Sequence, residues 1–141
     1  MAERHIGYLV KQINELIKQR ADKDMQCCGV TFSQGRIIGF LLENGGEAPQ
    51  KALTGHLGAS APTVTGLITR MEKKDMLSCR EDPDDRRGKM VALTDKSRAA
   101  ASSLVGLISA QEERMVKGLT QQQADELERL LETVLSNVSE P

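Results

Sequence analysis

Apolar residues recur three and four positions apart near both ends of the chain, a spacing that places them on one face of an α-helix. The pattern predicts one helix over residues 4–20 and a long helix over residues 95–117, which Gly118 ends. A final helix then carries a stripe made of Ala124, Leu127, Leu130, Leu131, Val134, Leu135 and Val138. The chain is therefore expected to begin with one amphipathic helix and to end with two.

Hydroxyl side chains mark where helices begin. Thr31 and Thr120 each stand three residues before a Gln, an arrangement in which the two residues cap one another. Thr94 is expected to cap the helix over residues 95–117. The helix that Thr31 opens ends at residues 44–46, and its expected inward-facing residues are Ile37, Ile38, Leu41 and Leu42.

The middle of the chain predicts two helices joined by a tight turn. Residues 49–57 form the first helix, Gly58 ends it, and Ser60 is expected to cap the second. The apolar residues of the second helix are Val64, Leu67, Ile68 and Met71. Its opposite face carries small and hydroxylated side chains and becomes basic towards the end of the helix. The helix is expected to end near Asp75, which would adopt the left-handed conformation.

Residues 81–94, EDPDDRRGKMVALT, combine four acids and three bases with one Pro and one Gly. The flanking runs LSCR and KMVAL predict two short strands, so the stretch between them is expected to be a hairpin loop of several residues. An EF-hand calcium loop is excluded, because the positions that need Gly and Glu hold Arg87 and Leu93. A solvated turn and a tip that contacts another molecule both stay open.

Two helices joined by a tight turn and followed by a hairpin predict a winged helix-turn-helix. The second helix suits a DNA groove, since small residues permit close approach, hydroxyls donate or accept, and a basic end meets phosphate. The pattern alone equally allows an amphipathic surface helix without a partner. In a wing, Arg86 and Arg87 would reach a narrow minor groove, and a neighbouring carboxylate would hold the arginine fork.

Composition and charge fit one soluble domain. The 141 residues are 39% hydrophobic and 28% charged, with no Trp and few other aromatic residues, so the core must be aliphatic. The formal net charge is −1, but residues 48–80 carry five bases against two acids, and residues 111–141 carry three against seven. No apolar run approaches the ~18 residues of a membrane span, and the N-terminus is not signal-like, so a cytoplasmic location is expected.

Cysteine and histidine usage predicts neither a disulfide framework nor a metal site. The three cysteines are an odd number, and two of them, Cys27 and Cys28, are adjacent. Cys79 is expected to behave as a small, partly buried hydrophobe. His5 and His56 are too scattered for metal binding, and no cofactor motif, phosphate loop or catalytic pairing is present, so no enzymatic activity is expected.

The central helices and the hairpin resemble the MarR family of winged-helix regulators. REDPDDRRGKMVALTDKSR is similar to the family's wing signature, D-x-R followed by V-x-L-T, matched here by residues 85–87 and 91–94. QKALTGHLGASAPTVTGLITRMEKKDML is similar to the family's Q-x-x-L-A-x-x-L-x-x-S-x-x-T-V-T-x-x-I-x-x-L-E-x-x-G-L. The predicted order of helices also agrees, so the resemblance covers nearly the whole chain.

This resemblance implies a mainly α, six-helix winged helix-turn-helix with a small β-wing, over residues 1–141 as a single chain. Residues 1–30 and 95–141 would be dimerisation helices, and residues 31–94 the DNA-binding lobe. It implies a homodimeric transcriptional regulator, expected to be a repressor, whose two recognition helices enter successive major grooves of an inverted repeat in double-stranded DNA. Many family members release DNA when a small aromatic or phenolic acid binds, so such an effector is expected.

Site residues follow from the resemblance position by position. The implied DNA contacts of the recognition helix are Ser60, Pro62, Thr63, Thr65, Gly66, Thr69, Arg70 and Lys73. Arg87 matches the wing arginine of D-x-R, with Asp85 as its orienting partner and Arg86 as a phosphate contact. The family often has Arg where this chain has Cys79, and the adjacent Arg80 would partly substitute for it.

Two alternatives stay open. Some family members sense oxidants through cysteine, which makes Cys27, Cys28 and Cys79 the candidate thiols of a redox-responsive regulator. The net charge of −1 instead motivates a winged helix that docks proteins without binding DNA.

Overall fold

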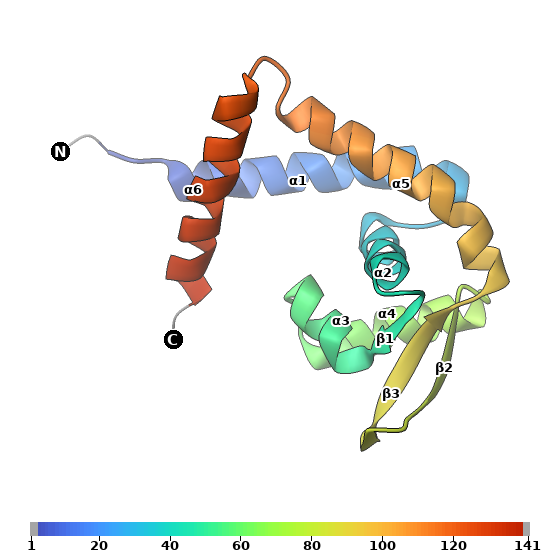
Figure 1. The fold of residues 1–141 in the computed structure, drawn as a ribbon. Coiled ribbons are helices and arrows are strands. Elements are labelled where there is room, and N and C mark those ends of the chain that lie inside the picture. The colour runs from blue at the N-terminus through green and yellow to red at the C-terminus, as the bar shows by residue number, and fades with distance from the viewer. Residues whose placement is uncertain (1–2, 140–141) are drawn as a thin grey trace. The chain divides into compact units, whose positions relative to one another are not determined.

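The computed structural model describes residues 3–139 and forms two compact units, Met1–Ile108 and Ser109–Pro141. In chain order the elements are α1 (Ile6–Met25), the 3-10 turn η1 (Gln26–Cys28), α2 (Phe32–Glu43), β1 (Glu47–Pro49), α3 (Gln50–Leu57), α4 (Ala61–Lys73), β2 (Leu77–Asp82), β3 (Asp85–Leu93), α5 (Asp95–Met115) and α6 (Gln121–Ser139) (Figure 1). The predicted fold, six α-helices with a small β-wing, is therefore confirmed over the described residues.

The first unit has an aliphatic core to which α2, α3, α4 and the sheet contribute, together with the end of α1 and the start of α5 (Figure 1). Its fully buried side chains include Ile37, Ile38, Leu41, Leu53, Val64, Met71, Val91 and Leu104. Burying an aliphatic side chain of this size stabilises a fold by about 1.5–3 kcal/mol relative to leaving it in water. Leu42 was wrongly predicted to face inward: it is 37% exposed, because it lies at the edge of the face that Ile37, Ile38 and Leu41 define.

The first helix continues beyond its predicted end at residue 20. Ala21 and Met25 are both buried and extend the apolar stripe by one further turn, so α1 ends at Met25. The remaining link contains the short η1 turn, and Gly29 closes it in the left-handed conformation at φ 71°. Helices α1 and α2 approach closely here, since a Cβ on Gly35 would lie 2.8 Å from the sulfur of Met25.

The hairpin is longer and its loop shorter than predicted. The three-stranded antiparallel sheet has the order β1-β3-β2, and the three-residue strand β1 was not predicted. Only Pro83 and Asp84 separate β2 from β3, because backbone pairing continues through the polar residues on both sides of them. The register shifts between the pairs Glu81↔Lys89 and Asp82↔Asp85, so residues 86–88 lie in an irregular part of β3.

The predicted helix caps at Thr31, Ser60, Thr94 and Thr120 are confirmed. Thr31 and Gln34 form a reciprocal capping box, and the Thr120–Gln123 pair repeats it. Thr94 is paired with the fully buried Ser97: the Thr94 amide donates to Ser97 Oγ (2.9 Å) and the Ser97 amide donates to Thr94 Oγ1 (3.2 Å). These bonds satisfy amide groups that have no partner within their own helix.

Asp75 adopts the left-handed conformation at φ 58°, as predicted, and is the only non-glycine residue with positive φ among residues 3–139. Replacing it with Gly removes the steric strain of Cβ, so Asp75→Gly is expected to raise the free energy of unfolding by about 0.5 kcal/mol. Urea denaturation at equal protein concentration measures this change. Lys74→Gly, at φ −91°, provides the control and is expected to lower stability; a loss of stability in both variants would contradict the prediction.

Candidate nucleic-acid interface

The helix-turn-helix consists of α3 and α4, connected by residues 58–60. Gly58 takes up the left-handed conformation at φ 62°, which reverses the chain at the end of α3 without a steric penalty. Ser60 then caps α4 by accepting a hydrogen bond from the amide of Thr63, and Pro62 occupies the first turn, where no intrahelical donor is lost. The turn and the start of α4 are thus set by local sequence.

Helix α4 has a buried face and an exposed face. Val64, Ile68 and Met71 are at most 2% exposed and hold the helix against the core. The structure brings together all eight recognition-helix positions predicted from the sequence at the start and along the outer side of α4. Gly66 is half-buried and the other seven are exposed: Ser60, Pro62, Thr63, Thr65, Thr69, Arg70 and Lys73. This surface is therefore open to a large ligand.

Most hydroxyl groups of this surface already have intramolecular partners. Ser60 Oγ and Thr63 Oγ1 lie 2.8 Å apart, and Thr69 Oγ1 donates to the backbone carbonyl of Thr65 at 2.8 Å. Gln50 Nε2, on α3, donates to Thr65 Oγ1 at 3.0 Å. Gln50 was not among the site residues predicted from the sequence; its only signal was its place as the first residue of the helix-turn-helix motif.

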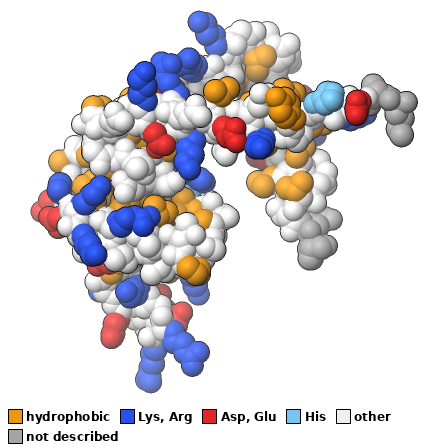
Figure 2. Space-filling view, turned by 180° about the vertical axis from the view of Figure 1, so that it is seen from behind, with side chains coloured by type: hydrophobic (Ala, Val, Ile, Leu, Met, Phe, Trp, Pro, Cys, Tyr) orange, Lys and Arg blue, Asp and Glu red, His pale blue; other side chains and the backbone are white. Residues whose placement is uncertain are grey.

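The wing carries Arg86 and Arg87 at its exposed tip. Figure 2 shows Lys and Arg side chains projecting at the lower end of the molecule, where Figure 1 places the end of the β2–β3 hairpin. Over the described residues neither arginine forms an ion pair with the protein. Their charges are therefore available to an anionic partner.

Asp85 positions the wing through the backbone and not through a guanidinium group. Its Oδ1 accepts a hydrogen bond from the Arg87 amide at 3.1 Å, while Asp82 Oδ1 accepts one from the Asp84 amide at 3.0 Å. The expected contact between a carboxylate and the arginine fork is absent among residues 3–139. A Cβ on Gly88 would lie 3.1 Å from the Asp85 carboxylate, so the glycine leaves room for it. The two carboxylates thus shape the tip.

Arg80 does not supply the free cation expected beside Cys79. Its guanidinium spans β3 and forms a two-bond ion pair with Glu47 of β1, at 2.7 and 3.0 Å. The same hydrogen bonds lower the pKa of the Glu47 carboxyl. The pair ties the first strand to the wing and gives the Arg80 guanidinium an intramolecular partner.

The three cysteines are free thiols, and the surroundings of two of them, Cys28 and Cys79, do not favour the thiolate. Burial, together with the nearby Glu72 carboxylate, raises the pKa of the Cys79 thiol to about 11. Burial and the neighbouring Cys27 raise the pKa of Cys28. The Cys27 and Cys28 sulfurs lie 3.8 Å apart, and Cys27 donates to the Asp24 carbonyl. Since the thiolate is the form that oxidants attack, this arrangement disfavours oxidant sensing at Cys28 and Cys79.

Neither a metal centre nor a membrane helix is found in the described part of the chain. No group of three or more His, Cys, Asp or Glu side chains is placed to hold a metal ion. None of the helices between residues 3 and 139 combines the length and the apolar character needed to cross a bilayer.

Comparison with known proteins identifies similar sequences. Residues 29–88 match the sequence model of the MarR family. The helix-turn-helix-type transcriptional regulator YwoH of Bacillus subtilis is 31% identical over 94 residues, which cover 67% of each chain. The helix-turn-helix-type transcriptional repressor IacR of Pseudomonas putida is 24% identical over 131 residues, which cover 93% of this chain and 78% of IacR.

Solved structures share the fold over nearly its whole length. MepR of S. aureus, in complex with DNA, superposes with a TM-score of 0.87 at 23% identity, over 97% of this chain and 100% of MepR. The organohalide-sensing regulator RdhR-CbdbA1625, in its 2,4-dichlorophenol-bound form, gives a TM-score of 0.80 at 19% identity, over 96% of this chain and 80% of that one.

Thiol labelling tests the cysteine environments. At pH 8 the Cys79 thiol should be ionised in only about one molecule in a thousand, because its pKa is about 11. A disulfide reagent is therefore expected to modify the exposed Cys27 first and Cys79 last in the native protein, and all three at similar rates in urea. Three variants, each of which keeps one cysteine and has the other two changed to Ser, assign each labelling rate to its cysteine. Fast native labelling of Cys79 would contradict the assigned environment.

Proposed function

Because the chain belongs to the MarR family of DNA-binding transcriptional regulators, we propose that it is a homodimeric repressor that binds a short inverted repeat in duplex DNA. Its family and its relatives are transcription regulators and not enzymes. The observation that carries the proposal is the pairing of two surfaces on one lobe. One is the exposed outer face of α4, and the other is the wing tip with its two unpaired arginines.

In this proposal α4 enters the major groove and the wing follows the adjacent minor groove. The small side chains Thr63, Thr65 and Gly66 permit close approach to base edges, and Arg70 and Lys73 meet phosphates. Arg87 reaches the minor groove, where negative potential is strongest, while Arg86 contacts the backbone. The MepR–DNA complex, which has the same fold, supports this docking, and the name of IacR supports repression as the mode of regulation.

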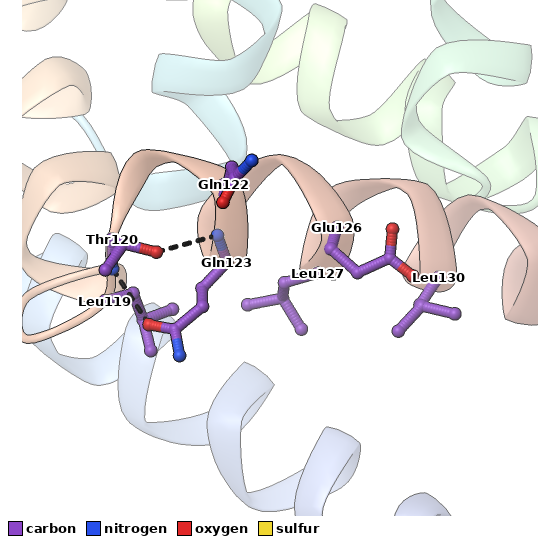
Figure 3. Close-up of a pocket in the computed structure, with 7 residues that line it drawn as sticks. All are labelled: Leu119, Thr120, Gln122, Gln123, Glu126, Leu127 and Leu130. Carbon is purple, nitrogen blue, oxygen red and sulfur yellow. Dashed lines mark hydrogen bonds between the residues drawn. The ribbon is translucent and has the colours of Figure 1, made fainter.

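The dimer would be built from residues 1–30 and 95–141, because the outer helices carry exposed apolar faces. On α1 these residues are Ile6, Leu9, Val10, Ile13 and Leu16, each at least 44% exposed. On α6 they are Leu127, Leu130, Leu131, Leu135 and Val138, each at least 40% exposed. Figure 3 shows Leu119, Leu127 and Leu130 pointing to the same side of α6. Apolar faces of this extent mark an association surface, and a second copy of the chain is the proposed partner.

The proposed regulator works in the cytoplasm and releases its operator when a small aromatic or phenolic acid binds. The phenol-bound RdhR structure, which shares the fold, supports an effector of this class. Titrating such acids into the complex of the protein with its selected duplex tests this part of the proposal.

Arg87→Ala tests the wing contact. Removing the guanidinium is expected to weaken binding to any duplex by roughly tenfold and to lower the slope of log affinity against log salt by about one per arginine lost. Fluorescence anisotropy of a labelled duplex at several salt concentrations measures both quantities. Arg129→Ala, which removes the same charge from α6, provides the control and should leave the slope unchanged. Equal affinity and an equal slope for Arg87→Ala and the unsubstituted protein would show that the wing does not touch DNA.

Leu130→Glu tests the dimer interface. A carboxylate on the apolar face of α6 would have to be buried without a partner, so the variant is expected to dissociate into monomers at micromolar concentration. Light scattering coupled to gel filtration measures the mass. Ser136→Glu adds the same charge to the opposite face of α6 and should remain dimeric. If both variants have the mass of a dimer, this face of α6 does not form the interface.

A further inference from the structure

A hydrogen bond joins the two helices of the helix-turn-helix on the surface proposed to face DNA. Gln50 is the first residue of α3 and Thr65 lies in the second turn of α4, and the distance from Nε2 to Oγ1 is 3.0 Å. We infer that this bond leaves the proton of the Thr65 hydroxyl free to donate towards the DNA, which favours a base with an acceptor in the major groove. The inference rests on the proposed function and adds a specificity-determining pair to it.

The donor role follows from what a hydroxyl group can do. A threonine hydroxyl has one proton to donate and two lone pairs that accept. The Gln50 amide occupies a lone pair on the side of Thr65 that faces α3. Because Thr65 is exposed, its proton and its second lone pair are directed towards whatever docks on α4.

Neighbouring hydroxyls differ from Thr65 in where their protons go. Thr69 Oγ1 donates to the carbonyl of Thr65, and Thr54 Oγ1 donates to the carbonyl of Gln50, each four residues earlier. Such bonds use the proton inside the helix and leave only acceptor capacity outside. Thr65 makes no bond of this kind within residues 3–139. Thr65 thus differs from Thr69 in that its proton stays available to DNA, while the Thr63 hydroxyl is already bonded to Ser60 Oγ at 2.8 Å.

A hydroxyl that donates discriminates among base pairs. In the major groove G offers N7 and O6 as acceptors, T offers O4, and A offers N7, whereas C presents only its N4 amino donor. Thr65 should therefore disfavour C at one position in each half-site. With C at this position the Thr65 hydroxyl loses the hydrogen bond that it would donate to the base. This loss is expected to lower the affinity by about fivefold.

Gln50→Glu is the variant that tests the inference. A carboxylate can only accept, so the Thr65 hydroxyl would turn to donate to Glu and would present a lone pair to the base. Preference at that one base pair should shift towards the amino-bearing bases C and A by about fivefold. Thr65→Val removes the hydroxyl with little change of shape and should abolish the preference at the same position.

The measurement is selection of bound sequences from a random duplex pool, followed by affinities for single-base variants of the selected site. Lys51→Gln, on the residue next to Gln50, makes the same change in net charge and should leave every base preference unchanged. Circular dichroism and thermal unfolding establish that each variant is folded.

The outcomes separate this inference from the proposed function. A shift confined to one base pair in Gln50→Glu, absent in Lys51→Gln, supports the inference. An unchanged preference, or a uniform loss of affinity at all positions, overturns it while the proposed function stands. If the unsubstituted protein enriches no sequence, sequence-specific binding fails and the inference falls with it.

Discussion

Burial of the inner face of α4 is the constraint on which the rest of the site depends. Val64, Ile68 and Met71 are packed into the aliphatic core, and this fixes the rotation of the helix about its axis. An α-helix completes one turn every 3.6 residues, so the same rotation directs Thr65, Thr69 and the basic end of α4 towards solvent. A chain with almost no aromatic residues achieves this packing with Ile, Leu, Val and Met, whose shapes suit contacts between helices.

Short polar contacts then refine what the core holds in place. Carboxylates at the wing accept hydrogen bonds from backbone amides, so the tip keeps its shape while Arg86 and Arg87 stay unpaired. The Glu47–Arg80 pair joins β1 to the wing across the central strand. Exposed pairs of this kind contribute little to stability, and their effect is one of position. On the wing, the carboxylates of Asp82 and Asp85 therefore hold the shape of the tip, and Arg86 and Arg87 form no ion pair within the described residues.

Most of the fold was predictable because its signals are local. Helical periodicity, the capping pairs at Thr31 and Thr120, and the left-handed Asp75 all depend on residues within a few positions of each other. The misses have a different origin. Strand β1 is too short to show a pattern of its own and exists only through its pairing with β3. The wing loop was predicted too long because strand signals are read from apolar side chains, whereas pairing of the backbone does not require them.

By itself, the sequence determined the order of the six helices, the residues that cap them and the exposed face of the recognition helix, since each follows from short-range spacing. Only the tertiary structure decided which polar groups are partners. Gln50 and Thr65 are 15 residues apart, Arg80 and Glu47 are 33 apart, and both pairs exist because packing and strand register bring their elements together. Packing likewise raised the pKa of the Cys79 thiol, because that pKa depends on burial and neighbouring charge, which no local pattern encodes.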